Sequence, residues 1–385
     1  AIDPATGYVE AMVGGGDYDV SQVNIATGTG GGGRQAGSTF KAFTLAAAIE
    51  KGISPQTRID CSSPMTKEID GREQTFENFD NIDYGVRTIQ SATAVSANTG
   101  YLRLSEEIGQ AATTEMAERL GVESPMSTVY TTTLGVASVT PLDMASAYAT
   151  LASDGTKRNP VVITEIEDKD GNIIYEAADT SKRVLSEEVA GATTNVLRQV
   201  FEASDGTAQN AKLDNGQPVV GKTGTSTDFA DHWLVGYTPS LSVATWIGNP
   251  AGSIATDTQL NCNALWKDFM DRACAGKAVE QFPETKAPSY NNAFNEKQKA
   301  ALGAEEEKST DKQTPTAITS GSQTATTSQA GGTATAKTPP DATGKTLAEA
   351  KELLKDWKAG SVTEYSSTVP KDSVIRQYIA SDGMV

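Results

Sequence analysis

Apolar residues recur at helical spacing over the first two thirds of the chain. The first such stretch begins near Ser38, and its apolar residues crowd every face before Gly52 ends it, a pattern typical of a buried helix. Apolar residues three or four positions apart predict further helices at 88–104, 110–120, 141–152, 187–201 and 263–274. This region is therefore expected to be rich in helices.

Strands are indicated between these helices by short apolar runs next to turn residues. Lys169-Asp170-Gly171 is a hairpin signal that joins the runs 161–166 and 172–175. Further strands are expected at 8–13, 218–225, 233–237 and 241–247. Because strands occur near both ends of this region, we expect a mixed α/β domain in which they share one antiparallel sheet.

The composition changes towards the end of the chain. Residues 309–340 are almost wholly Thr, Ala, Ser, Gly and Gln, and such a segment cannot bury enough apolar surface to offset its ordering entropy. Beyond it, a short amphipathic helix at 346–357 and strands at 361–368 and 373–379 indicate a small module. We therefore predict a domain, a linker and a partial module at 1–285, 286–339 and 340–385.

Charge and hydropathy exclude several classes of partner. The chain carries 49 Asp and Glu residues against 32 Lys and Arg residues, a net charge of −17. A surface of that sign repels phosphate backbones and anionic lipids, so no nucleic-acid partner is expected. No run of about 18 apolar residues predicts a membrane span. The chain also opens without Met or a signal sequence, which suggests a piece of a longer protein.

Histidine and cysteine usage restricts the chemistry. His232 is the only histidine, so a Ser-His-Asp hydrolase must use it, and we expect a structural role for it instead. The cysteines, Cys61, Cys262 and Cys274, are too few and too scattered for a zinc site, and no metal or cofactor is expected. Cys262 and Cys274 flank a predicted helix and are either a disulfide or buried thiols.

Serine chemistry without histidine needs another base, and lysine can serve. Ser38 and Lys41 lie three residues apart at the start of the first predicted helix, which brings their side chains within reach. To accept a proton, Lys41 must have its pKa lowered from about 10.4 to near neutrality, which costs about 4 kcal/mol. Burial against Phe40 and Phe43, or a second cation nearby, could lower it.

The Ser-x-x-Lys spacing alone is weak, because it also occurs at Ser309–Lys312 in the predicted linker, and Ser-x-Asn occurs twice as well. The order of three motifs is more specific. Ser38–Lys41 opens a helix, Ser96-Ala97-Asn98 follows a helical run, and Lys222-Thr223-Gly224 lies on a predicted strand. These three motifs in this order are the signature of penicillin-binding proteins and related β-lactamases.

With these motifs, residues 1–285 resemble the transpeptidase domain of class A (bifunctional) penicillin-binding proteins. Other segments that carry the resemblance are 1–7, 34–38, 133–152 and 231–239. The resemblance implies the α/β fold shared with β-lactamases, a central antiparallel sheet flanked by helices. Residues 340–347, with Tyr365 and Pro370, resemble a PASTA module, which adds a small α+β unit.

The resemblance implies a role for each motif residue. Ser38 would attack the penultimate D-Ala carbonyl of a peptidoglycan stem peptide, with Lys41 as the base. Ser96 would relay a proton to the leaving amine, Asn98 would hold the donor peptide amide, and Lys222 would add positive field.

The resemblance also implies how substrate is held. Thr223 and Thr225 would bind the terminal carboxylate, with Gly224 between them. The backbone N–H groups of Ser38 and Thr225 would form the oxyanion hole, where losing one donor typically costs about 10²–10³ in rate.

The resulting interpretation is a cell-wall D,D-transpeptidase that β-lactams acylate. Its expected partners are D-Ala-D-Ala stem peptides as donors, an amine on a second stem peptide as acceptor, and cell-division or elongation proteins. The expected location is the outer face of the bacterial plasma membrane, with an anchor in a preceding segment. Two alternatives stay open: a D,D-carboxypeptidase or β-lactamase, in which water resolves the acyl-enzyme, and a wall-binding or sensory module without catalysis.

Overall fold

The computed structural model describes residues 1–19, 22–30, 32–226, 229–249, 254–256 and 261–310. The chain divides into two compact units, Ala1–Thr314 and Pro315–Val385. The helix and strands predicted at 346–379 lie outside the described residues. In the described part of the chain, no helix is long and apolar enough to cross a membrane.

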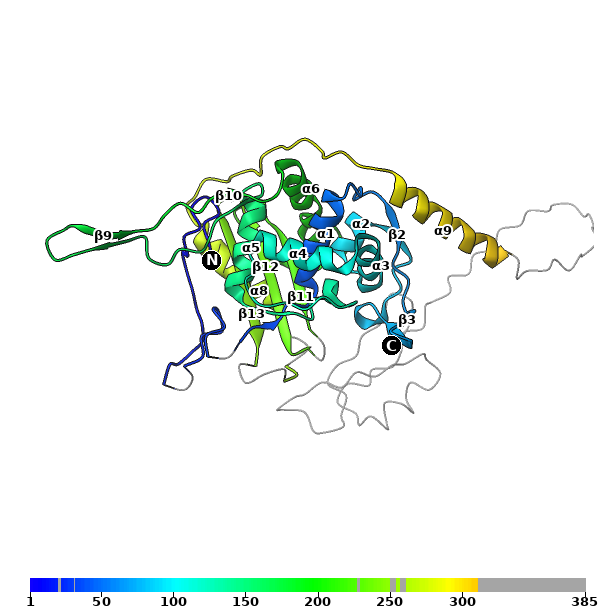
Figure 1. The fold of residues 1–385 in the computed structure, drawn as a ribbon, viewed down its shortest axis with the longest axis horizontal. Helices are drawn as coiled ribbons and strands as arrows, with labels where there is room; N and C mark the ends of the chain where they lie inside the picture. Colours follow the sequence, from blue (N-terminus) through cyan, green and yellow to red (C-terminus); the bar gives the residue numbers. More distant parts are fainter. Residues whose placement is uncertain (20–21, 31, 227–228, 250–253, 257–260, 311–385) are drawn as a thin grey trace, which may run out of the picture. The chain divides into compact units, whose positions relative to one another are not determined.

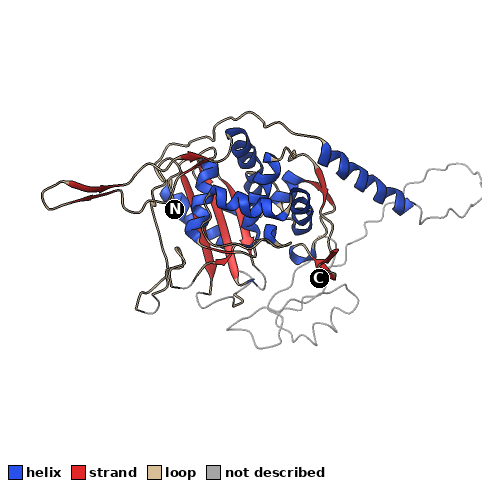
Figure 2. Ribbon diagram, viewed as in Figure 1, coloured by secondary structure: helices blue, strands red, loops and turns tan. Residues whose placement is uncertain are grey.

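A three-stranded antiparallel sheet organises the first unit. It consists of β11 (Val220–Thr225), β12 (Asp231–Thr238) and β13 (Leu241–Gly248), in that order across the sheet. Every residue of the central strand β12 is buried, because both faces of the sheet are covered. The predicted antiparallel sheet flanked by helices is therefore confirmed (Figure 2).

Side chains alternate across the sheet and pack on two layers of helices. Val235 and Tyr237 join the core that includes α5, whereas Leu234 packs with Trp266 of α8. Gly236 faces α8 too, and a Cβ there would lie 2.9 Å from the Trp266 ring. The helices of these layers are α1 (Lys41–Glu50), α4 (Gln110–Leu120), α5 (Pro141–Ala152), α6 (Glu187–Leu197), α7 (Gln199–Glu202) and α8 (Cys262–Ala273).

Helices α4 and α5 begin and end at the predicted residues. At α5, Thr140 and Asp143 form a reciprocal capping box and Pro141 occupies the first helical position, so the start was readable from the sequence. The helix predicted from Ser38 begins instead as a 3-10 turn, η1 (Gly37–Phe40), which leads into α1.

The single helix predicted at 88–104 is wrong. Two helices occupy this region, α2 (Ile89–Ala94) and α3 (Asn98–Ile108). They are separated at Ser96, whose backbone adopts the left-handed conformation with φ of 60°. A left-handed residue cannot continue a right-handed helix, and the apolar periodicity does not register it.

The strand predicted at 8–13 is also wrong. Tyr8 and Val9 form only isolated bridges. Val9 packs against the core, but Val13 is 84% exposed, so the end of this run has no partner strand and no core contact. Ile2 instead extends the sheet by bonding Ser242 of β13 in both directions, at 2.8 and 2.9 Å. Both ends of the region do share the sheet, through Ile2.

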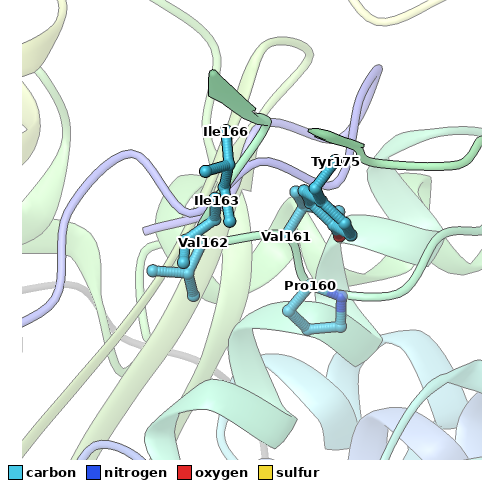
Figure 3. A pocket seen from close by; sticks show the side chains of 6 residues that line it. All are labelled: Pro160, Val161, Val162, Ile163, Ile166 and Tyr175. Carbon is cyan, nitrogen blue, oxygen red and sulfur yellow. The ribbon is translucent and has the colours of Figure 1, made fainter. Parts of the chain in front are cut away.

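The predicted hairpin is present as β8 (Glu165–Glu167) and β9 (Ile173–Glu176), and it extends away from the sheet (Figure 1). Six residues near its base line a hollow that contains no charged side chain, as Figure 3 shows: Pro160, Val161, Val162, Ile163, Ile166 and Tyr175.

The remaining strands form two-stranded pairs: β1 (Arg34–Gln35) with β6 (Ser138–Val139), β2 (Arg58–Asp60) with β5 (Val86–Thr88), β3 (Met65–Ile69) with β4 (Arg72–Phe76), and β7 (Thr156–Lys157) with β10 (Lys182–Arg183). Short 3-10 turns are η2 (Phe79–Asn81), η3 (Thr132–Leu134) and η4 (Gln209–Ala211). A further helix, α9 (Ala293–Thr310), lies within the range predicted as linker, and its Phe294 is buried.

The three cysteines are buried and free. Cys262 is the first residue of α8 and Cys274 follows the last, so about 18 Å of helix separates them. The disulfide alternative for this pair is therefore wrong, because a disulfide needs Cα atoms within about 7 Å.

Candidate active site

Ser38 and Lys41 meet where η1 leads into α1. The Lys41 Nζ lies 3.0 Å from the Ser38 Oγ. Lys41 is completely buried, whereas Ser38 is partly exposed. A substrate can therefore reach the hydroxyl while the amine behind it is shielded from water.

Glycines allow η1 to lie directly against β11. Gly37 has φ of 56°, and a Cβ there would come within 2.7 Å of the Thr225 carbonyl oxygen. A Cβ on Gly224 would come within 2.6 Å of the Ala36 carbonyl oxygen. Both approaches are closer than a side chain permits, so these glycines set the distance between Ser38 and the third motif.

The second motif reaches the same lysine from the turn between α2 and α3. Lys41 Nζ donates to the Ser96 carbonyl oxygen at 2.6 Å and to Asn98 Oδ1 at 2.7 Å, and it lies 3.2 Å from Ser96 Oγ. Asn98 Nδ2 donates to the Glu77 carbonyl oxygen at 2.8 Å. That bond fixes the amide, because it leaves only the oxygen end to face Lys41.

Lys222 on β11 completes the cluster. Its Nζ donates to Ser96 Oγ at 2.8 Å and to the Thr223 carbonyl oxygen at 3.0 Å, and its side chain is fully buried. The Ser96 hydroxyl therefore lies between the amines of Lys41 and Lys222. The structure thus brings Ser38, Lys41, Ser96, Asn98 and Lys222 together from three separate segments.

Burial governs the charge of both lysines. It lowers the pKa of Lys41 well below the usual 10.5, and the nearby charge of Lys222 lowers it further. Burial also lowers the pKa of Lys222, to about 7. The second cation expected from the sequence is therefore Lys222, and the Tyr101 ring lies 5.5 Å from the Lys41 Nζ.

The hydrogen bonds of Lys41 leave the lone pair of its neutral amine available for Ser38. A neutral amine has two N–H groups and one lone pair. The Ser96 carbonyl and Asn98 Oδ1 can only accept, so they take both N–H groups. The lone pair then remains for the Ser38 hydroxyl at 3.0 Å.

Thr223, Gly224 and Thr225 follow Lys222 along β11. Thr223 Oγ1 lies 2.6 Å from the exposed Thr207 hydroxyl, a neighbour that no sequence motif indicated. Thr225 is paired in register with His232 of β12. The His232 ring is buried and bonds Thr256 Oγ1 at 2.7 Å. The described residues hold no cluster of three or more His, Cys, Asp or Glu side chains placed to bind a metal.

Comparison with known protein families identifies the family of this chain. The family model for the penicillin-binding protein transpeptidase domain matches residues 1–261, and that of the PASTA domain matches 337–385. The chain belongs to the penicillin-binding protein transpeptidase family, and the resemblance seen in the sequence is confirmed.

Curated relatives carry the same family name. The chain is 33% identical to penicillin-binding protein 1A of Aquifex aeolicus over 64% of its length, and 32% identical to penicillin-binding protein 1A of Mycolicibacterium smegmatis over 74%. It spans only 33% and 38% of those two proteins.

Solved structures share the fold. The PonA1 protein from Mycobacterium tuberculosis in complex with penicillin V superposes with a TM-score of 0.66 at 29% identity, covering 75% of this chain and 81% of that one. Penicillin-binding protein 1A from Haemophilus influenzae superposes with a TM-score of 0.68 at 24% identity, covering 74% and 48%.

Proposed function

We propose that residues 1–285 form a D,D-transpeptidase domain that cross-links peptidoglycan stem peptides through an acyl-enzyme on Ser38. One observation carries the proposal: a fully buried lysine contacts Ser38, Ser96 and Asn98, and a second buried lysine contacts the same Ser96 hydroxyl. Family membership supports it, as does the relative solved with penicillin V.

In the first step, Ser38 Oγ attacks the carbonyl carbon of the penultimate D-Ala. Its proton passes to the lone pair of Lys41 Nζ, 3.0 Å away. A tetrahedral oxyanion forms as the C–O bond is made. Positioned proton transfer of this kind contributes about 10²–10⁴ in rate.

In the second step, the C–N bond breaks and D-Ala leaves. The Ser96 hydroxyl gives its proton to the leaving nitrogen and recovers one from the Lys41 ammonium at 3.2 Å. Lys41 is then neutral again. In its protonated form, Lys222 stabilises the oxyanion and the substrate carboxylate. The products are free D-Ala and an ester on Ser38.

The backbone of β11 suits both the oxyanion and an extended peptide. Ser226 donates its N–H to the Asp231 carbonyl, and alternation along an antiparallel ladder then directs the N–H of Thr225 away from β12, towards the open edge of the sheet. The Cβ position of Gly37, next to Ser38, lies 2.9 Å from that Thr225 nitrogen. This proximity supports the assignment of the Ser38 and Thr225 N–H groups to the oxyanion hole.

The substrate carboxylate and the donor amide have separate partners. Thr223 and Thr225, on either side of Gly224, are both partly exposed and are assigned to the terminal carboxylate. Asn98 is assigned to the donor peptide amide, since its side chain is partly exposed next to Ser96.

An amine on a second stem peptide is the proposed acceptor for the acyl group. In the described part of the chain, no carboxylate bonds Ser38, Lys41 or Ser96, so a dedicated base for water is not placed at the ester. This favours transpeptidation over the carboxypeptidase and β-lactamase alternatives. The proposed location is the outer face of a bacterial plasma membrane, where stem peptides and cell-division or elongation proteins are found.

The test is incubation with a D-Ala-D-Ala stem peptide and an amine acceptor, followed by mass analysis of the products. We expect a cross-linked product, one D-Ala released per cross-link, and neither in the Ser38→Ala variant. Free D-Ala without any cross-link would favour a carboxypeptidase. A penicillin adduct lost within seconds would favour a β-lactamase, and no reaction in either assay would favour a wall-binding module.

A further inference from the structure

Asn78 is a buried polar residue that no sequence motif indicated. It lies between β4 and η2, is 3% exposed, and uses every polar atom of its side chain. Its Nδ2 donates to the carbonyl oxygens of Cys61 at 2.8 Å and Ile82 at 2.9 Å. These two bonds fold the connecting loop around the amide and fix its orientation.

The other end of this amide caps α3 from outside the helix. Asn78 Oδ1 accepts the backbone N–H of Asn98 at 2.8 Å and of Thr99 at 3.1 Å. The residue in the capping position, Ala97, has no side chain able to do so. Asn78 therefore supplies the cap that the Ser96-Ala97-Asn98 turn lacks.

Glu77, the residue before Asn78, also contacts Asn98. The Glu77 carbonyl oxygen accepts from Asn98 Nδ2 at 2.8 Å, while Asn98 Oδ1 accepts from Lys41 at 2.7 Å. Residues 77 and 78 thus hold both the backbone and the side chain of Asn98. Asn98 therefore connects residues 77 and 78 to the amine of Lys41, which lies beside Ser38.

We propose that Asn78 is a positioning residue for acylation: it holds Asn98, and through Asn98 it sets the geometry and charge of Lys41. The inference rests on the function proposed above. It extends that function to a residue outside the three motifs and away from the substrate.

Two substitutions should shift the charge of Lys41 in opposite directions. Asn78→Ala removes the cap, leaves two N–H groups of α3 without their acceptor and loosens Asn98, so the protonated form of Lys41 loses stabilisation. Asn78→Asp keeps an acceptor for both N–H groups but loses the two bonds that Nδ2 donates to the Cys61 and Ile82 carbonyls. It also adds a negative charge, which stabilises protonated Lys41. The pKa of Lys41 should fall in the first variant and rise in the second.

Neither substitution adds or removes any other titratable group around Lys41, although both remove the bond from Asn78 to the Cys61 carbonyl. Lys222 on β11, the Cys61 thiol after β2 and the Tyr101 ring on α3, 5.5 Å from Nζ, are the titratable groups that face it. Burial raises the pKa of Cys61 to about 12, so this thiol stays neutral through the pH range of the assay. A difference between the two variants therefore reports on Asn78.

The experiment measures the rate of acylation by a fluorescent penicillin from pH 4 to 9 in the full chain. We expect both variants to be slower than wild type, by between about 10- and 100-fold in Asn78→Ala. The acidic limb of the profile should move to lower pH in Asn78→Ala and to higher pH in Asn78→Asp.

Ser186→Ala is the matched control, because Ser186 caps α6 through the Val189 N–H and bonds no cluster residue. It should lower the melting temperature without moving the pH profile. Shifts in the same direction in both Asn78 variants, or a lower melting temperature with unchanged acylation, would overturn the inference. If Asn78→Ala does not fold, the direction of the shift in Asn78→Asp decides. Failure of wild type to acylate would instead overturn the proposed function.

Discussion

Ser96 shows how one residue's conformation assembles a site. Its left-handed backbone, with φ of 60°, ends α2 and turns both its carbonyl oxygen and its hydroxyl towards Lys41. A non-glycine residue in this conformation is strained by about 1–2 kcal/mol. The hydrogen bonds to the two lysines hold Ser96 in place against that strain.

Two substitutions of Ser96 distinguish the backbone strain at this residue from the catalytic role of its hydroxyl. Ser96→Ala and Ser96→Gly both remove the hydroxyl between Lys41 and Lys222, so acylation by a penicillin should slow about 100-fold in each. Glycine also relieves the left-handed strain, so Ser96→Gly should be more stable than Ser96→Ala by about 1 kcal/mol in urea unfolding. Equal stabilities would show that the backbone is relaxed there.

Whether the sequence could predict a contact in the site depends on how far apart the two residues lie along the chain. Ser38 and Lys41 are three positions apart, so helical spacing alone places them together. The contact of Ser96 with Lys222 spans 126 positions, and only the order of the motifs indicated it. Asn78 has no periodic or motif signal, because a buried capping amide and a loop asparagine look the same in a sequence.

At the scale of elements, the close packing of η1 on β11 determines where the nucleophile lies. That packing depends on Gly37 and Gly224, each placed where a Cβ would meet backbone oxygen. Backbone atoms cannot rotate away as a flexible side chain can. An added methyl group must therefore move one element relative to the other.

Gly224→Ala should displace η1 from β11. The new Cβ would lie 2.6 Å from the Ala36 carbonyl oxygen, so Ser38 shifts relative to Lys222 and acylation should fall about 100-fold. Stopped-flow labelling with a fluorescent penicillin measures this rate. Gly16→Ala is the control, because no atom lies within 4 Å of its Cβ position. Unchanged acylation in Gly224→Ala would mean that the packing does not set the geometry of the site.

Element boundaries were predictable where local chemistry marks them. The capping box of Thr140 and Asp143 marks the start of α5, and both ends of α4 were predicted. The break at Ser96 was missed because the following helix, α3, is capped by Asn78, which lies 20 positions before Asn98 in the sequence. Periodicity reports which face of a segment is buried and carries no information about a cap supplied by another segment.

The hollow at the hairpin base offers a contrast with the cluster at Ser38. Val162 and Ile163 line it and are 70% and 53% exposed (Figure 3). Replacing either by Thr should leave acylation within about twofold and the unfolding free energy within about 0.5 kcal/mol, as for surface positions generally. The same labelling and urea assays measure both. A large loss of acylation would place the hollow within the substrate site.

At the scale of the whole molecule, buried titratable groups make stability depend on pH. Lys41 and Lys222 have lowered pKa values, with Lys222 at about 7, so above neutrality the unfolded chain binds more protons than the folded one. Stability therefore rises with pH in that range, by about 1.4 kcal/mol per unit for each proton of difference. Buried thiols reverse the trend: the pKa of Cys61 and of Cys262 is raised to about 12, so they lose protons first in the unfolded chain.

We accordingly expect the unfolding free energy to rise from pH 7 to about pH 9 and to fall above it. The reversal comes where unfolded cysteines, with pKa near 9.0, and tyrosines begin to ionise while their folded counterparts do not. Urea unfolding at a series of pH values measures this. Lys222→Met should flatten the rising part, and an unchanged slope would show that Lys222 is charged throughout.

The most direct test of the central claim is the position of the penicillin adduct. We expect incubation with penicillin V to add one intact drug molecule, mapped by peptide mass to Ser38 and persisting for hours. The Ser38→Ala variant should carry no adduct. An adduct on another residue, or equal labelling of Ser38→Ala, would contradict the claim that Lys41 makes this hydroxyl the nucleophile.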